Sequence, residues 1–207
     1  MARIVAFPYA SSLSAMPLSE LFLLRPGAFR HACENQQAPF WISAFLFLVG
    51  IVYGVLVAFL QRALGGELQG VPTATIPLWV LALGNSVMGV LITVLVHLGV
   101  TLVAWLMAKA VGGPGYLPLL YRTSGYLLPL TLPALPALAF NTATTTIQNP
   151  GATAMPLLYL PLAGLGAALF LAGLYRALRV TQDLTPARTA FAVALFAAFS
   201  ASILSIA

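Results

Sequence analysis

Long apolar runs dominate the pattern of hydrophobic and polar positions, and short segments rich in glycine, proline or charge separate them. Five runs fall at about 39–64, 78–111 (with a start near 78 or 84), 117–140, 155–178 and 186–206. A run of about 20 apolar residues is long enough to cross the hydrocarbon core of a bilayer as a helix. The pattern therefore predicts an all-α polytopic membrane protein, a bundle of five transmembrane helices.

The second and third runs are joined by residues 112–115, with the sequence Gly-Gly-Pro-Gly. Neither a helix nor a strand continues easily through this composition, so we expect a tight turn at a membrane surface. The third run contains Pro129, Pro133 and Pro136, each of which removes a backbone donor, and this predicts a kinked helix. Broken helices occur at solute sites of transporters, and also in ordinary bundles where the kink only improves packing.

Residues 1–38 form the one sizeable segment outside the predicted spans, and residues 39–207 form the predicted transmembrane domain. Pro26 precedes a predicted helix over 28–35, in which Phe29, Ala32 and Cys33 share one face. Two interpretations remain open. The segment is either a short amphipathic helix lying at the membrane interface, with its arginines towards anionic headgroups, or a connector that packs on the bundle.

Glycines at helical spacing predict where helices approach closely. Gly50 and Gly54 form a GxxxG motif in the first run, which we interpret as packing within the bundle, with self-association as a weaker alternative. Gly164, Gly166 and Gly173 are expected to do the same in the fourth run.

Composition agrees with an integral membrane protein. Hydrophobic residues make up 61% of the chain and charged residues 6%, which is too little charge to solvate a soluble domain of this apolar content. The net charge of +5 comes from lysines and arginines scattered singly at the ends of the apolar runs, an arrangement typical of headgroup contacts and not of nucleic-acid binding. The one cysteine excludes an intrachain disulfide.

The distribution of basic residues predicts the orientation. With a cytoplasmic N-terminus, the chain would place eight of its nine lysines and arginines on the cytoplasmic side and leave only Arg62 outside. This is a strong positive-inside bias, so five spans would put the C-terminus outside.

The sequence offers little catalytic chemistry. Its four carboxylates, Glu20, Glu34, Glu67 and Asp183, all fall in predicted loops or near the N-terminus, and no nucleophile elbow, zinc motif or phosphate loop is present. We therefore expect no catalytic residue, no cofactor and no metal, and a protein that is not an enzyme. His97 is an ionisable residue within a predicted span and so a functional candidate by default.

Two groups of residues are candidate sites. The first is a partner- or lipid-binding face at the predicted cytoplasmic surface; its residues would otherwise serve only as topology anchors. It consists of Arg25, Arg30, Glu34, Lys109, Arg122, Arg176, Arg179 and Asp183. The second is a possible intramembrane polar or kink site, made by His97, Tyr126, Pro129 and Pro133.

Two segments resemble a known family. The sequence Pro-Phe-Trp-Ile at 39–42 and the sequence Gly-Tyr-Leu-Leu-Pro at 125–129, after a glycine-rich turn, are similar to signature segments of the Yip domain, the Ypt-interacting membrane proteins. The Leu-Arg-Pro sequence at 24–26 and the arginine-ended fourth run add to this resemblance, which extends from about residue 18 to the C-terminus. It implies a five-span fold. Eukaryotic members are linked to Rab-type small GTPases and vesicle traffic, while bacterial members have no settled function.

The residues at 35–38, Asn-Gln-Gln-Ala, depart from the eukaryotic motif, which has an acid, a tyrosine and a glycine before the proline. A bacterial member in the cytoplasmic (inner) membrane therefore fits better. We expect a non-enzymatic scaffold or accessory subunit that binds membrane lipids, other membrane proteins or itself, and no nucleic acid. The alternative is a small-solute or lipid transporter or channel that uses the proline-kinked third span.

Overall fold

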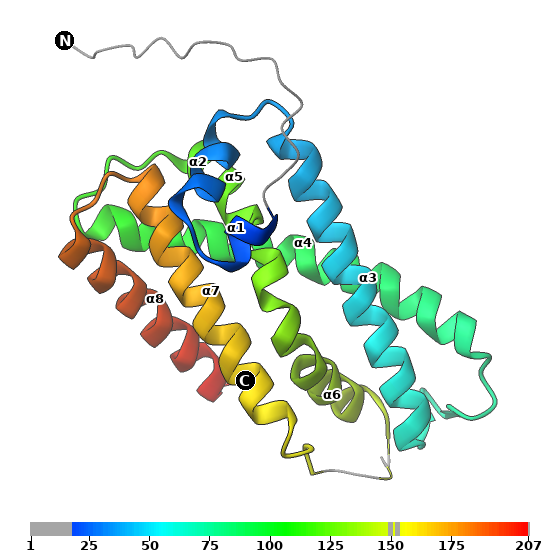
Figure 1. Cartoon of the computed structure of the whole chain (residues 1–207). Coiled ribbons are helices and arrows are strands. Elements are labelled where there is room, and N and C mark those ends of the chain that lie inside the picture. The colour runs from blue at the N-terminus through cyan, green and yellow to red at the C-terminus, as the bar shows by residue number, and fades with distance from the viewer. Residues whose placement is uncertain (1–17, 149–150, 152–153, 207) are drawn as a thin grey trace.

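The structure is a computed structural model that describes residues 18–148, 151 and 154–206. Within these ranges the chain is almost entirely helical (Figure 1). The elements, in chain order, are α1 (Leu18–Phe22), α2 (Pro26–Glu34), α3 (Ala38–Leu64), β1 (Glu67–Leu68), β2 (Val71–Pro72), α4 (Leu78–Ala110), α5 (Leu117–Gly125), the 3₁₀ helix η1 (Leu128–Ala134), α6 (Leu135–Thr146), α7 (Tyr159–Thr181) and α8 (Pro186–Ile206).

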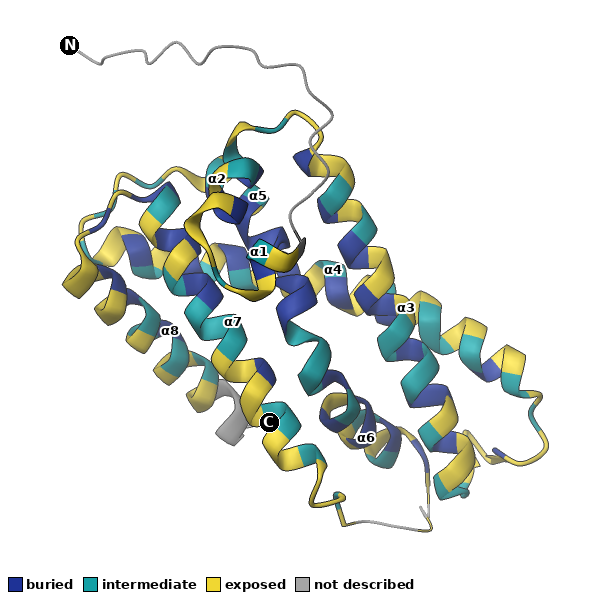
Figure 2. Ribbon diagram, viewed as in Figure 1, coloured by how far each residue is buried: buried dark blue, intermediate teal, exposed yellow. Residues whose placement is uncertain are grey.

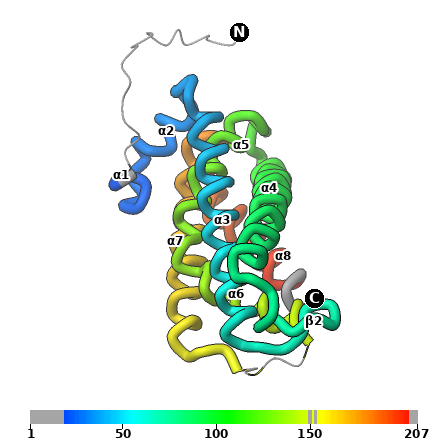
Figure 3. Tube along the Cα trace, turned by 90° about the vertical axis from the view of Figure 1, so that its right-hand side faces the viewer, coloured from blue at the N-terminus to red at the C-terminus, as the bar shows by residue number. Residues whose placement is uncertain are grey.

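The helices form an elongated bundle with two distinct ends (Figures 1 and 3). One end, here named the charged end, carries α1, α2, the 112–115 turn and the connection from α7 to α8. The other, here named the hairpin end, carries the β1–β2 hairpin and the connection from α6 to α7. The predicted tight turn is confirmed, because α4 ends at Ala110, α5 begins at Leu117, and Gly112 and Gly115 adopt positive φ.

Three helices, α3, α4 and α7, are long and apolar enough to cross a membrane. Helix α5 and the segment Leu128–Thr146 are together also long and apolar enough to cross a membrane, with a bend of 45° between them. If these two parts form a single span, it is the fourth. The apolar part of α8, Pro186–Ser202, is shorter. The all-α fold is confirmed, whereas the prediction of five spans is not.

The third predicted span is broken rather than simply kinked. The α-helix stops at Gly125, and the chain then continues as η1, with Pro133 inside the 3₁₀ helix and Pro129 in its first turn. Prolines lack the N–H that an α-helix needs in its interior, which accounts for the break at this point. The hydroxyl of Thr131 donates to the Leu128 carbonyl at 2.7 Å and satisfies one of the acceptors that the break leaves.

The helix after this break runs further than the sequence indicates, to Thr146 instead of about residue 140. Threonine hydroxyls in the extra turns are satisfied by donating to carbonyls one turn back: Thr145 to Asn141 at 3.0 Å and Thr146 to Thr142 at 2.8 Å. The fourth span likewise begins at Tyr159, later than predicted, and extends to Thr181.

The crossing of α3 and α4 depends on glycine. A Cβ at Gly50 would lie 2.6 Å from the Cα of Val90, and a Cβ at Gly54 would lie 2.3 Å from the Asn85 carbonyl oxygen. Both contacts are with the helix backbone, so only glycine permits this approach. The prediction that the GxxxG motif packs within the bundle is confirmed.

Two of the three glycines predicted to allow close packing in α7 do so. A Cβ at Gly166 would lie 2.7 Å from the Ala134 side chain, and one at Gly173 would lie 2.7 Å from Leu130. Gly164 is exposed and faces open space, so the prediction was wrong there. The difference follows from the turn of the helix, which directs position 164 away from η1.

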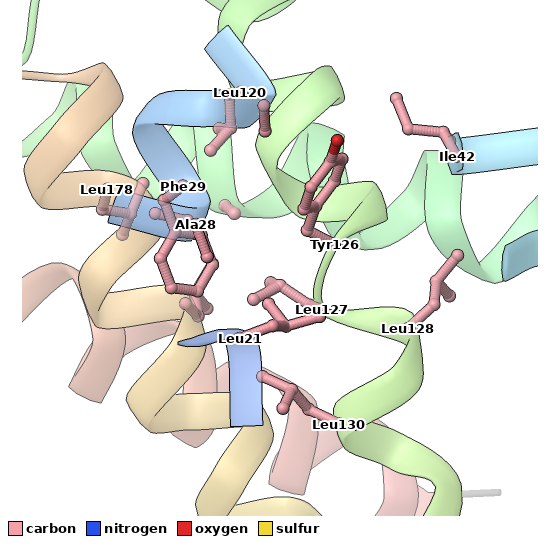
Figure 4. Packing of buried hydrophobic residues seen from close by; sticks show 14 of the residues in the cluster. Leu21, Ala28, Phe29, Ile42, Leu120, Tyr126, Leu127, Leu128, Leu130 and Leu178 are labelled. Atoms are coloured by element: carbon pink, nitrogen blue, oxygen red, sulfur yellow. The ribbon is translucent and has the colours of Figure 1, made fainter. Parts of the chain in front are cut away.

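The apolar face of α2 packs on the bundle. Ala28, Phe29 and Ala32 are buried against α5 and α7, and Leu21 of α1 is buried beside them. Figure 4 shows Phe29 between Leu178 of α7 and Leu127, and Figure 2 shows the buried band that continues into the bundle. The expected interfacial amphipathic helix is therefore corrected to the packed connector. The described part of the 1–38 segment shares its core with the bundle.

Backbone pairing closes the hairpin end. The β1–β2 hairpin turns at Gln69 and Gly70, both at positive φ, as expected of a type I′ turn. Glu67 exchanges two backbone hydrogen bonds with Gln148, at 3.0 and 2.8 Å, which joins the hairpin to the segment after α6. Arg62 donates to the Ile76 carbonyl at 2.5 Å. The isolated arginine of the sequence thus stabilises this loop.

Candidate functional site

The predicted cytoplasmic residues gather at the charged end. Arg25, Arg30 and Glu34 come from α2 and its N-terminus, Lys109 from the last turn of α4, Arg122 from the last turn of α5, Arg176 and Arg179 from the end of α7, and Asp183 from the loop that follows. All are exposed except Arg122, which is half-buried. Arg188 in the first turn of α8 joins them, a residue that the sequence-based site did not include. Cations near the C-terminal ends of α4, α5 and α7 also complement the helix dipoles.

A buried glutamine holds the centre of this end. Gln182 is fully buried, accepts the Gly115 N–H through its Oε1 at 3.1 Å, and donates from Nε2 to the Tyr116 carbonyl at 3.2 Å. The 112–115 turn is thereby connected to the end of α7, far along the chain. Sequence reasoning missed Gln182, because an uncharged glutamine in a predicted loop gives no sign of what it will contact.

Trp105 and Lys109 lie one helical turn apart on α4, next to the same turn. The indole Nε1 of Trp105 donates to the Gly115 carbonyl at 2.9 Å, which fixes the ring. The Lys109 ammonium lies 5.1 Å from the centroid of that ring, within range of a cation–π interaction. The lysine remains exposed, so its charge is available to a partner.

Cys33 lies on α2 in the field of two charged neighbours. The pKa of its thiol is raised to about 11, mainly by burial and further by the Glu34 carboxylate, while the Arg122 guanidinium acts in the opposite direction. A thiol with this pKa is almost wholly protonated at neutral pH and is a poor nucleophile. Its environment is that of a packing residue.

His97 is the most unusual residue in the membrane-spanning part. It is 2% exposed, its ring contacts that of Tyr121 with 4.8 Å between centroids, and its Nε2 is buried with no hydrogen-bond partner in the described part of the chain. One turn further along α4, Thr101 donates to the His97 carbonyl at 2.8 Å, and its hydroxyl pairs with that of Ser124 at 2.7 Å. These hydroxyls join α4 to α5.

Tyr126, Pro129 and Pro133 belong to the break between α5 and α6. Tyr126 is fully buried, packs edge-on against Phe45 with centroids 5.9 Å apart, and its hydroxyl has no hydrogen-bond partner among the described residues. Figure 4 shows this hydroxyl directed away from Leu127 and Leu128. No hydrogen bond or ring contact among the described residues joins Tyr126 to His97.

A lateral groove opens between α4 and α5 beside His97. Its volume is about 390 Å³, and its walls are almost wholly apolar. The lining residues are Leu98, Thr101, Leu102, Leu117, Pro118 and Tyr121. The side of α4 that faces it is exposed, so the groove is open to whatever surrounds the bundle.

Sequence analysis also missed a polar network at the hairpin end. Gln61 is 1% exposed, its Nε2 donates to the Thr146 hydroxyl at 2.8 Å, and its Oε1 accepts from Asn85 at 2.9 Å. Gln61 belongs to α3, Thr146 to α6 and Asn85 to α4. Their hydrogen bonds satisfy polar groups that would be costly to leave unpaired. The network therefore has a structural role.

The described residues include no group of three or more histidine, cysteine or carboxylate side chains that could hold a metal ion. Comparisons of the chain with protein-family models, with curated proteins and with solved structures found no match. The resemblance to the Yip domain stays a prediction.

Proposed function

We propose that the chain is a non-enzymatic membrane scaffold or accessory subunit, which binds acidic partner membrane proteins or anionic lipids through its charged end. The observation that carries this proposal is the gathering of exposed cations at that end, where Arg179 also donates to the Leu184 carbonyl, whereas Arg62 is the one cation that the described residues place at the hairpin end. The cations project from elements that are packed against one another, since α2 is docked on α5 and α7 and Gln182 holds the 112–115 turn.

Electrostatics supports binding at this surface. Each lysine or arginine near a membrane surface attracts anionic groups by about 1 kcal/mol, and the effect falls off within a Debye length. Several cations on one packed surface therefore favour an acidic partner without a deep pocket. The exposed carboxylates Glu34 and Asp183 offer acceptors for a partner's own cations.

This proposal places the charged end in the cytoplasm and the hairpin end outside, with α8 as a fifth span. The positive-inside bias supports this orientation. We further propose a bacterial inner-membrane protein of the Yip type, a hypothesis that rests on the sequence resemblance, chiefly of the segments at 39–42 and 125–129.

Native mass spectrometry of the protein, extracted in nanodiscs with its surrounding membrane, tests the proposal. We expect a partner of fixed stoichiometry, whose occupancy falls when Arg122 or Arg176 is replaced by glutamine. Arg62→Gln, at the opposite end, is the matched charge control and should keep the partner. Unchanged occupancy in both charge-end variants would contradict the proposal.

A second candidate, a small-solute or lipid transporter or channel, has its own support. The α5–η1–α6 pair is bent by 45° at its break, and His97 has a buried, unpartnered nitrogen in the described structure. Both features occur along solute paths. This candidate predicts solute flux in vesicles containing the purified protein, reduced in Pro129→Ala and in His97→Ala. Equal flux in empty vesicles would reject it.

A further inference from the structure

We propose that the groove between α4 and α5 binds one anionic phospholipid, with an acyl chain along the groove and the headgroup at Lys109. The lipid site rests on the proposed function in one respect: the proposed orientation places the charged end at a membrane surface. It is independent of any protein partner.

One face of α4 forms a continuous wall for such a lipid. Leu98, Leu102, Trp105 and Lys109 follow one another at intervals of four, three and four residues, which brings them onto one side of the helix. The stripe changes from aliphatic to aromatic to cationic towards the charged end. The same order, from hydrocarbon through interface to headgroup, occurs along a lipid in a bilayer.

The groove admits a hydrocarbon chain and not a polar solute. Its wall surface is almost wholly apolar, and the hydroxyl of the wall residue Thr101 already donates to the His97 carbonyl and pairs with Ser124. Tyr121 and Leu117 complete the opposite wall, and each is 37% exposed. A polar ligand here would lose its hydrogen bonds to water and find few partners, whereas a methylene chain loses nothing.

Two cations lie at the 112–115 turn, which joins the two helices that form the groove. The Lys109 ammonium lies over the fixed Trp105 ring, and Arg188 approaches the same turn, with its Nη1 3.4 Å from where a Cβ at Gly112 would be. The Gly115 N–H and carbonyl are both already bonded, to Gln182 and Trp105. Side-chain cations are thus the groups available to a phosphate at this place.

The charge, and not the groove, has to select the lipid. An acyl chain is as well solvated by other lipid tails as by leucine side chains, so entering the groove gains little free energy. A lysine at the membrane surface contributes about 1 kcal/mol towards an anionic headgroup, which corresponds to a preference of about fivefold. We therefore expect Lys109 to set headgroup preference, and the groove to set only where the chain lies.

The test uses purified full-length protein in nanodiscs of equal phosphatidylglycerol and phosphatidylethanolamine, with a photoactivatable diazirine in the acyl chain of one lipid at a time. We expect crosslinks concentrated on the peptides of the groove walls, about fivefold more from phosphatidylglycerol. Lys109→Gln should reduce that preference, and Lys109→Gln/Arg188→Gln should abolish it. Arg176→Gln, an exposed cation of the same end on α7, should retain it. Leu102→Trp, which fills the groove, should move the crosslinks elsewhere.

Crosslinks spread evenly over the membrane-facing helices, or a headgroup preference that is undiminished in both Lys109→Gln and Lys109→Gln/Arg188→Gln, would overturn the proposal. Thermal melting of each variant shows that it is folded. No protein partner is present in the crosslinking experiment, so a negative result there would leave the proposed binding of a protein partner intact. Conversely, finding no partner by native mass spectrometry would leave the lipid site intact.

Discussion

Replacing Gly89 with alanine tests the α3–α4 crossing directly. A Cβ at this position would lie 2.3 Å from the Gly50 carbonyl oxygen, about 1 Å short of ordinary contact. The obstructing atom belongs to a helix backbone, so no side chain can rotate to make room. The two helices would have to separate along their contact, which also weakens the neighbouring approach of Gly54 to Asn85.

The magnitude follows from two opposing effects. Overpacking a well-packed site typically costs about 1–3 kcal/mol, and the upper end applies where backbone meets backbone. Alanine in a helix recovers about 1 kcal/mol relative to glycine. We expect Gly89→Ala to lower the free energy of unfolding by about 2 kcal/mol.

Gly99 on the same helix is the matched control. It faces open space, with nothing within 4 Å of a Cβ, so Gly99→Ala should be neutral or stabilise by up to about 1 kcal/mol. Unfolding by titration with a denaturing detergent measures both variants. The double variant Gly54→Ala/Gly89→Ala should cost less than the sum of its parts, because either change alone separates the helices. If the unfolding free energies of the Gly89→Ala and Gly99→Ala variants differ by less than about 0.5 kcal/mol, the proposed crossing is refuted.

Three further predictions concern single side chains. Gln61→Ala should lower the unfolding free energy by about 1–2 kcal/mol, because Asn85 and Thr146 each lose a buried partner; an unchanged detergent midpoint would contradict the network. The alkylation rate of Cys33 at pH 7.5 should be about 100-fold lower than in the unfolded chain, because the pKa of its thiol is raised. The rate should increase with pH up to about 11. Equal rates in the folded and unfolded chains would show that the thiol is accessible and its pKa unperturbed. His97→Leu should keep or raise stability by about 1 kcal/mol, because the imidazole Nε2 has no partner in the described structure, whereas a clear loss would reveal a bound group there.

Local chemistry explains which parts of the fold the sequence predicts. Glycine and proline determine backbone conformation through their own geometry, so the 112–115 turn, the GxxxG contact and the start of α2 at Pro26 could be predicted without a structure. The end of α6 could not, because threonine-rich segments occur in loops as well as in helices. In the structure the threonine hydroxyls bond within the helix, to carbonyls one turn back, which the composition alone does not specify.

The candidate site was only partly predictable for a related reason. Charged residues at the ends of apolar runs indicate a common surface by counting alone, and the structure places them at one end. Gln61 and Gln182 gave no such signal, since their partners lie tens of residues away and are brought near only by packing. The groove has the same origin, because its walls come from two helices whose relative tilt no local pattern specifies.

The length of α4 has a consequence for the membrane itself. Its 33 residues extend about 50 Å, whereas the hydrocarbon core of a typical bilayer is about 30 Å thick. Such hydrophobic mismatch is relieved by tilt or by local thickening of the bilayer. Because the glycine contacts join α3 rigidly to α4, the two helices must tilt together, and a thicker bilayer would bring both more upright. The orientation of the whole protein, and with it the height of its cations above the lipid surface, should therefore vary with membrane thickness.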